Sequence, residues 1–301
     1  MSRRGRGLPL EAVAVWALFA VVGLEILVTY ARLPATKLYR VTGSGLEGGA
    51  SRVLSFMNFP VALAAVALLL LIFDSLDSRS LRALACAAAL LCLVVVWPGV
   101  VDQANLDARP VNVVPAVGVL LTLGLTMFVG RRGLTTRPWH RLDWARLALA
   151  LVLAFVAVPW FAAELGFFLP GHFFQTAHAA VQLPGDPKNL PAVHHGHHHG
   201  MDGLLLALTA LLLSRRLDVV RTRGLRLALS GCLALMLCYA IANMANDAWD
   251  EQVVKRGWTH WQIPSVLTPK ASAAWGLIVL AAATLWVVWV VLAPSGKRVR
   301  I

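Results

Sequence analysis

The sequence predicts an all-α, polytopic integral membrane protein with about eight transmembrane helices and both termini in the cytoplasm. Of its 301 residues, 58% are hydrophobic and only 14% are charged, and the mean hydropathy is +0.71. Soluble domains carry about 25% charged residues, so this composition excludes an ordinary soluble protein. The apolar residues also form runs of about 20, which is the length that crosses ~30 Å of hydrocarbon as a helix.

Eight such runs follow one another, and we interpret residues 1–301 as a single transmembrane helical domain. The first run follows a short basic segment and has no small-residue cleavage site after a short apolar core, so we expect it to remain as an anchor. The predicted spans are 9–30, 54–73, 81–101, 111–130, 145–168, 195–214, 225–245 and 272–293.

The basic residues predict how the chain is oriented. Lys and Arg lie in the tails, in the loops and at the ends of spans, and 18 of the 27 fall on the side of the two termini. The positive-inside rule therefore predicts a multi-pass protein of the cell membrane with cytoplasmic termini. The net charge of +12 is explained by these short basic loops, which we expect to face anionic lipid headgroups. No nucleic-acid partner is predicted.

The four loops on the other side are longer and chemically more varied, and eight of the nine histidines belong to that side. Only His140 is predicted to be cytoplasmic. We therefore expect function near the extracytoplasmic surface. These outer loops are 31–53, 102–110, 169–194 and 246–271.

A histidine cluster opens the sixth predicted span. Five histidines fall between positions 194 and 199, and Asp202 follows. Counting back from the basic pair at 215–216 predicts that the cluster forms the first turns of that span. On a helix His195, His199 and Asp202 would share one face, with His194 and His198 as a second pair beside it. Two imidazoles and a carboxylate at this spacing can bind one metal ion.

Acidic and imidazole side chains at the ends of other spans are candidates to complete this site. Glu164 lies near the end of the fifth span, and intramembrane carboxylates are functional candidates by default. Asp102 and Asp247 lie at the ends of the third and seventh spans and, with Glu164, are the predicted catalytic carboxylates. The predicted metal ligands are His194, His195, His198, His199, Asp202, Glu164, His172 and His178.

The leading interpretation is a membrane metalloenzyme. Nitrogen and carboxylate ligands suit Zn, Fe, Mn or Cu, and Zn is the default for three ligands and an open water position. The metal would make hydroxide available near neutral pH for a hydrolase or transferase acting on a lipid or lipid-linked substrate. The alternatives are a metal-ion transporter or metal-handling protein and a non-catalytic assembly subunit. The cluster itself could also be a solvated loop, a pH-sensing patch or a helix-packing element.

A glycine-rich stretch at positions 43–49 follows the first span. Glycine-rich backbone can cradle a phosphate, and Arg40 and Arg52 flank the stretch. The stretch is not a P-loop because no Gly-Lys-Ser/Thr follows it. A flexible turn is the simpler interpretation. If a lipid phosphate binds here, Asn58, Pro60 and Glu25 could line the same cavity.

Overall fold

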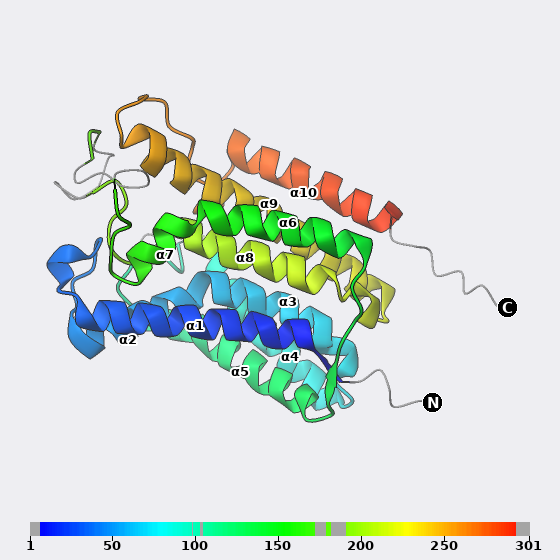
Figure 1. The fold of residues 1–301 in the computed structure, drawn as a ribbon. Helices are drawn as coiled ribbons and strands as arrows, with labels where there is room; N and C mark the ends of the chain where they lie inside the picture. The colour runs from blue at the N-terminus through cyan, green and yellow to red at the C-terminus, as the bar shows by residue number, and fades with distance from the viewer. Residues whose placement is uncertain (1–6, 98, 103–104, 172–178, 182–190, 293–301) are drawn as a thin grey trace.

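The computed structural model describes residues 7–97, 99–102, 105–171, 179–181 and 191–292. Within this part the long helices lie side by side in one bundle (Figure 1). The described strands are β1 (Leu8–Pro9) and β2 (Leu134–Thr135), which pair in parallel over two residues. The predicted all-α class is therefore confirmed. The α-helices are α1 (Leu10–Arg32), α2 (Gly45–Phe56), α3 (Ala62–Ile72), α4 (Arg79–Leu93), α5 (Val113–Gly130), α6 (Arg141–Val156), α7 (Val158–Glu164), α8 (His199–Ser214), α9 (Arg223–Trp249) and α10 (Ala273–Leu292).

Short turns of other helix types extend or connect these helices. Five are 3₁₀ turns: η1 (Ala35–Lys37), η3 (Phe73–Ser75), η4 (Val94–Val96), η5 (Pro110–Asn112) and η6 (Leu217–Val219). Two are π-helical turns, η2 (Met57–Val61) and η7 (Asp250–Val254).

Six of the described helical segments are long and apolar enough to cross a membrane. A seventh is added if α6 and α7, which are bent by 56°, count as one span. α8 has only 16 residues, or about 24 Å of helix, so eight crossings remain a prediction. The start of α1 and the end of α10 lie at the same end of the bundle, as an even number of crossings requires (Figure 1). The six segments are Leu10–Arg32, Gly45–Ser75, Arg79–Val96, Pro110–Gly130, Arg223–Val254 and Ala273–Val290.

Among the described α-helices, α8 is the most deeply buried. Thirteen of its sixteen residues are buried, and it packs along α9. Gly203 permits this approach, because a Cβ at that position would lie 2.7 Å from Met244 Cγ and 2.8 Å from the Ala240 carbonyl oxygen. Small residues bring membrane helices together in this way.

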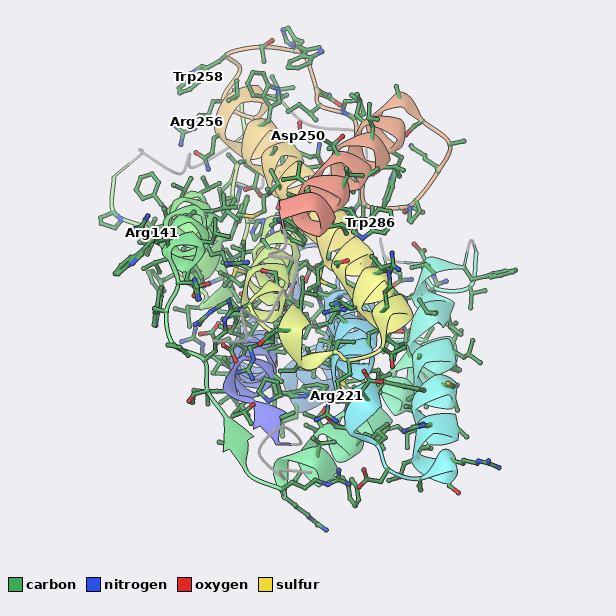
Figure 2. All side chains as sticks on the ribbon, turned by 90° about the vertical axis from the view of Figure 1, so that its right-hand side faces the viewer. Arg141, Arg221, Asp250, Arg256, Trp258 and Trp286 are labelled. Atoms are coloured by element: carbon green, nitrogen blue, oxygen red, sulfur yellow. The ribbon has the colours of Figure 1, made fainter. Side chains whose placement is uncertain are left out.

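The last helix, α10, packs on the outer side of α9. Trp286 points toward α9 and donates a hydrogen bond from its indole N–H to Ser230 Oγ at 2.9 Å (Figure 2). The opposite face of α10 is apolar and exposed at Leu277 and Leu280. A helix that exposes large aliphatic side chains is typical of a surface that faces lipid.

The π-helical turns η2 and η7 both border the functional site described below. Pro60 lies inside η2 and lacks a backbone N–H, so the α-helical hydrogen-bond pattern cannot continue through it. The turn η7 continues α9 and carries Glu251. π-helical turns redirect the side chains around them and occur frequently at functional sites.

The glycine-rich stretch is not a flexible turn in the structure. α2 begins at Gly45, so much of the stretch forms its first turns. Gly49 faces α1, where a Cβ would lie 2.6 Å from the Leu27 carbonyl oxygen. These glycines therefore allow two helices to pack closely, and the first predicted outer loop is shorter than 31–53.

The basic end of the bundle differs from the prediction in one respect. Arg216 is only 4% exposed and donates to Glu11 Oε2 at 3.0 Å, and Arg215 lies 3.5 Å from Glu11 Oε1. Arg146 pairs with Asp143 at 2.9 Å. Arg215 and Arg216 bind a carboxylate of α1, and Arg146 binds one within its own helix, α6. A guanidinium that is removed from water needs an acidic partner. They do not all serve as contacts to lipid headgroups.

Candidate metal centre

The histidine cluster does not form the first turns of a helix, contrary to the prediction. α8 begins only at His199, and His198 has extended backbone angles, φ −106° and ψ 151°. Gly196 has φ +107°, a conformation that other residues rarely adopt, and a Cβ there would lie 2.5 Å from Tyr30 Oη. The cluster therefore lies in an extended segment outside the helices that are long enough to span a membrane.

Two side chains of α9 hold the start of α8 in place. Asp247 Oδ2 accepts a hydrogen bond of 2.6 Å from the Gly200 N–H, which is one of the N–H groups that a helix leaves unpaired at its start. Asn243 Nδ2 donates to the His199 carbonyl oxygen at 2.8 Å. A carboxylate also interacts favourably with the helix dipole at this position. Polar side chains near the end of the seventh predicted span thus position the histidine segment.

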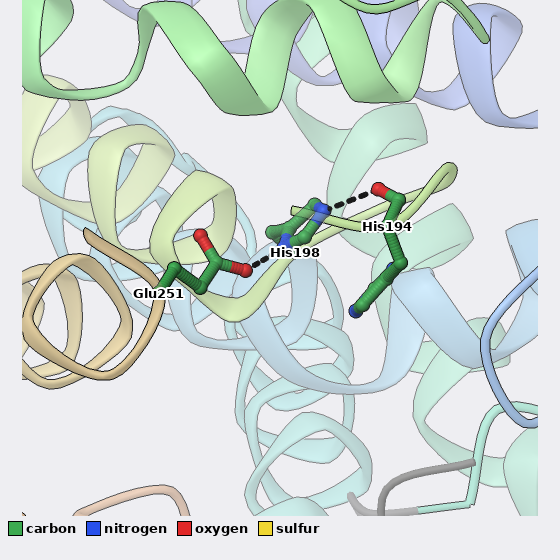
Figure 3. A group of neighbouring side chains, drawn as sticks. All are labelled: His194, His198 and Glu251. Atoms are coloured by element: carbon green, nitrogen blue, oxygen red, sulfur yellow. Dashed lines mark hydrogen bonds and ion pairs between the residues drawn. The ribbon is translucent and has the colours of Figure 1, made fainter. Parts of the chain in front are cut away.

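Three residues come together as a group that could hold a metal ion. His194, His198 and Glu251 each offer a ligand atom, and these atoms lie within 4.8 Å of one another. Figure 3 shows the Glu251 carboxylate facing the His198 ring, with Oε1 2.8 Å from Nδ1. All three residues are buried, with 7%, 3% and 2% of their surface exposed. Two nitrogen ligands and one carboxylate with this burial match the ligand sets of catalytic zinc sites.

Backbone carbonyls orient both imidazoles. His198 Nε2 lies 2.9 Å from the His194 carbonyl oxygen, and His194 Nδ1 lies 3.1 Å from the His195 carbonyl oxygen. A carbonyl oxygen only accepts hydrogen bonds, so each of these ring nitrogens must carry the proton. The other nitrogen of each ring, Nδ1 of His198 and Nε2 of His194, is then the one available to a metal ion. Metal-binding histidines are held by the same kind of hydrogen bond.

Aromatic side chains enclose the group. His194 stacks between Tyr39 and His198, with ring centroids 4.3 Å and 4.1 Å away. Trp160 Nε1 donates to Glu251 Oε2 at 2.5 Å, so Oε1 is the oxygen left for His198 or an ion. These contacts fix the ring planes before any ligand binds.

Burial and neighbouring charges set the protonation of the two histidines. Burial, the neighbouring His198 and Lys255 lower the pKa of His194 well below its usual value, so its ring is neutral near pH 7. Burial also acts to lower the pKa of His198, but the Glu251 carboxylate outweighs it and raises that pKa. A proton then lies between His198 and Glu251 when no ion is bound. Metal ions compete with protons for such positions.

A second buried arrangement lies directly beside this group. The His197 ring is held between two carboxylates, with Nδ1 bonded to Glu164 Oε1 and Nε2 2.5 Å from Asp202 Oδ1. Burial alone would lower the pKa of His197, yet Asp202 and Glu164 raise it to about 10. The ring is therefore a cation that donates from both nitrogens. The backbone N–H of His197 donates to Tyr30 Oη at 3.1 Å, which fixes the ring between its partners.

The other predicted site residues lie in several places. Asp247 Oδ2 is 4.0 Å from His198 Nδ1, so it borders the metal group. Asp102 and His199 line a separate pocket together with Asp202. His195 lies away from the group and stacks on Phe168 with ring centroids 4.0 Å apart. Two further predicted ligands, His172 and His178, lie outside the described residues.

Two residues of the site, His197 and Glu251, are missing from the sequence-based assignment. His197 has no carboxylate three or four residues away in the chain, and its two carboxylate partners come from α7 and α8. Glu251 follows Asp247 by one helical turn, so its spacing was a usable signal. The sequence-based assignment includes Asp247 from this segment but not Glu251.

Comparison of the chain with protein families, with curated proteins and with solved structures finds no match. The residues and their geometry therefore carry the functional argument.

Proposed function

We propose that this chain is a membrane metalloprotein in which His194, His198 and Glu251 bind a divalent transition metal ion. The observation that carries the proposal is the buried group of three ligand atoms within 4.8 Å of one another. The hydrogen bonds from both rings to backbone carbonyls support it, because they leave one nitrogen of each ring for an ion. Zn is the default, and Fe, Mn or Cu would accept the same ligands.

We further propose that the site is catalytic and acts on a lipid or lipid-linked substrate at the extracytoplasmic surface. A bound ion would lower the pKa of a water molecule toward ~7 and supply hydroxide for hydrolysis or transfer. Asp247 is the carboxylate placed to accept the proton of that water, since it lies 4.0 Å from His198 Nδ1 without belonging to the group of three. The Gly200 N–H holds the Asp247 carboxylate in this position.

The alternative of metal transport has less support. A transport path needs polar groups through the membrane, but α8, which leads away from the site, has no ionisable side chain from Gly203 to Leu213. This segment is almost entirely buried Leu and Ala. An ion held at the start of α8 therefore has no evident route along this helix.

Metal content of the purified protein tests the proposal. We expect about one ion per chain in the detergent-solubilised protein and little in His198→Ala and Glu251→Gln. His260→Ala is the matched control, because His260 is exposed and lies outside the group. Adding zinc to chelator-treated wild type should raise its unfolding temperature, and should not raise that of the folded variants. Wild type that neither retains nor rebinds metal would contradict the proposal.

Catalysis is tested separately from metal binding. Asp247→Asn keeps an oxygen for the Gly200 N–H but cannot accept a proton, so we expect normal metal content and a kcat lower by roughly 10²–10⁴. The readout is the mass-spectrometric change in vesicle lipids incubated with wild type or variant. Wild type that leaves the vesicle lipids unchanged but carries metal into those vesicles would favour transport over catalysis.

A further inference from the structure

A pocket next to the buried group of Glu164, His197 and Asp202 contains a buried arginine, Arg52. The described residues provide no acidic partner for it. The pocket holds about 400 Å³ of empty space, including solvent at its mouth, and Arg52 of α2 lines it. Arg52 is only 5% exposed. Its Nε is buried without a hydrogen-bond partner, and no carboxylate of the described residues pairs with its guanidinium. Its described neighbour is the Tyr30 ring, whose centroid lies 5.8 Å from Cζ.

This arrangement differs from the other buried arginine of the described chain, Arg216, which pairs with Glu11 at 3.0 Å. Removing a guanidinium from water without an acidic partner is unfavourable. A bound anion would supply the missing negative charge and offset this penalty. Because guanidinium matches the geometry of phosphate oxygens, the first candidate is a phosphate group.

Further donors line the same pocket. The amide oxygens of Asn105 and Asn112 both accept backbone N–H groups, at 3.0 Å and 2.6 Å. Their NH₂ groups are therefore the ends left to donate to a ligand. The hydroxyl of Ser55, one turn after Arg52 on α2, is buried without a hydrogen-bond partner. A guanidinium, two amides and a hydroxyl form a donor set suited to an oxyanion.

The acidic groups of the pocket do not cancel this charge. Asp202 accepts a hydrogen bond from His197 Nε2 at 2.5 Å and lies 3.8 Å from His199 Nδ1, so its carboxylate is engaged by imidazoles and does not pair with Arg52. Asp102 is exposed, and water screens its charge. Arg52 is therefore the buried arginine that a ligand would meet among the described residues of the lining.

Apolar residues form another wall of the pocket, namely Phe56, Phe59, Pro60, Val101 and Leu267. A pocket that pairs oxyanion donors with an apolar wall suits the headgroup of an amphiphile. We propose that it binds a phosphate ester through Arg52, Ser55 and the two asparagine amides. This site does not depend on the metal, although it would supply the substrate class for the proposed enzyme.

Ligand-induced stabilisation tests the proposal. The probes are dihexanoyl phosphatidic acid, inorganic phosphate and neutral dihexanoylglycerol, added to the purified protein in detergent. We expect phosphatidic acid to raise the unfolding temperature of wild type, and Arg52→Gln to weaken its binding roughly tenfold to hundredfold. Arg109→Gln is the matched control, because it removes one exposed charge close to the same pocket.

The variant also distinguishes a binding role from a structural one. Without ligand, Arg52→Gln should unfold at the same temperature as wild type or higher, because it removes an unpaired buried charge. Stabilisation by both phosphatidic acid and inorganic phosphate would identify a general phosphate site, and stabilisation by the lipid alone would identify a lipid headgroup site. No stabilisation, equal stabilisation by dihexanoylglycerol, or stabilisation that persists in Arg52→Gln would overturn the proposal. Phosphatidic acid should also stabilise His198→Ala. The phosphate site can therefore be tested even if the proposed metal site is wrong.

Discussion

The indole N–H of Trp160 on α7 donates a hydrogen bond of 2.5 Å to Glu251 Oε2 on η7. The same indole ring lies against Gly200, where a Cβ would approach it to 2.1 Å. Trp160, which belongs to α7, therefore contacts both the start of α8 and the turn η7 at the end of α9. These segments surround the metal group. Two of the predictions below follow from this one side chain.

The first prediction concerns the hydrogen bond to Glu251. Trp160→Phe keeps an aromatic ring beside Gly200 but removes the donor, so the carboxylate loses its orientation. We expect zinc affinity to fall about 10–100-fold, as for other side chains that orient metal ligands. Competition titration against a zinc chelator measures the effect. Trp258→Phe, at a tryptophan that is 71% exposed, should bind zinc like wild type.

The second prediction concerns the close approach of α8 and Trp160. Gly200→Ala places a methyl group where the indole lies, and overpacking of this kind destabilises by about 1–3 kcal/mol. We also expect weaker zinc binding, because the indole must move away from Glu251. Gly224→Ala is the control, since a Cβ there meets nothing within 4 Å and should be neutral or stabilising. Unfolding in a denaturing detergent measures both variants.

The third prediction concerns the buried triad of Glu164, His197 and Asp202. His197→Gln removes the cation between two buried carboxylates and should destabilise the protein by about 3–5 kcal/mol. The triple variant that also carries Glu164→Gln and Asp202→Asn has no uncompensated charge, so it should be more stable than the single variant. A triple variant that unfolds more easily than His197→Gln would show that the charges are not the source of the effect.

The fourth prediction concerns the ion pair at the other end of the bundle. Glu11→Gln leaves Arg216 buried without its carboxylate, and we expect a loss of about 3–5 kcal/mol with unchanged zinc content. Replacing both partners, in Glu11→Leu with Arg216→Met, should restore most of this stability. Glu47→Gln, at an exposed residue, should have no effect. A similar loss in Glu47→Gln would point to a general effect of net charge.

The helices were predictable because their cause is local. An apolar run of about 20 residues must satisfy its backbone hydrogen bonds internally in a membrane, and helix occupies most of each of the eight predicted segments. The sequence also identified the parts of the chain that meet at the site. The predicted residues His194, His198, Glu164 and Asp202 belong to one of its two arrangements, and Asp247 borders the metal group.

The partnerships among these residues were not predictable from spacing. The assumption that the histidines continue a helix paired His195 with His199 and Asp202, but Gly196 turns the chain and α8 starts at His199. His195 consequently stacks on Phe168, and His197 takes the position between two acids. The non-helical backbone at Gly196 and His198 therefore accompanies the pairing of rings and carboxylates that the structure has.

The sequence alone determined that this protein is helical and apolar, and that its imidazoles and acids collect at the ends of predicted spans, because hydrophobic length and charge are properties of each segment. Only the tertiary structure decided that Glu251 faces His198, that His197 is enclosed by Glu164 and Asp202, and that Arg52 is buried without an acidic partner among the described residues. These relationships join helices far apart in the chain, so they depend on packing distances that no single segment contains.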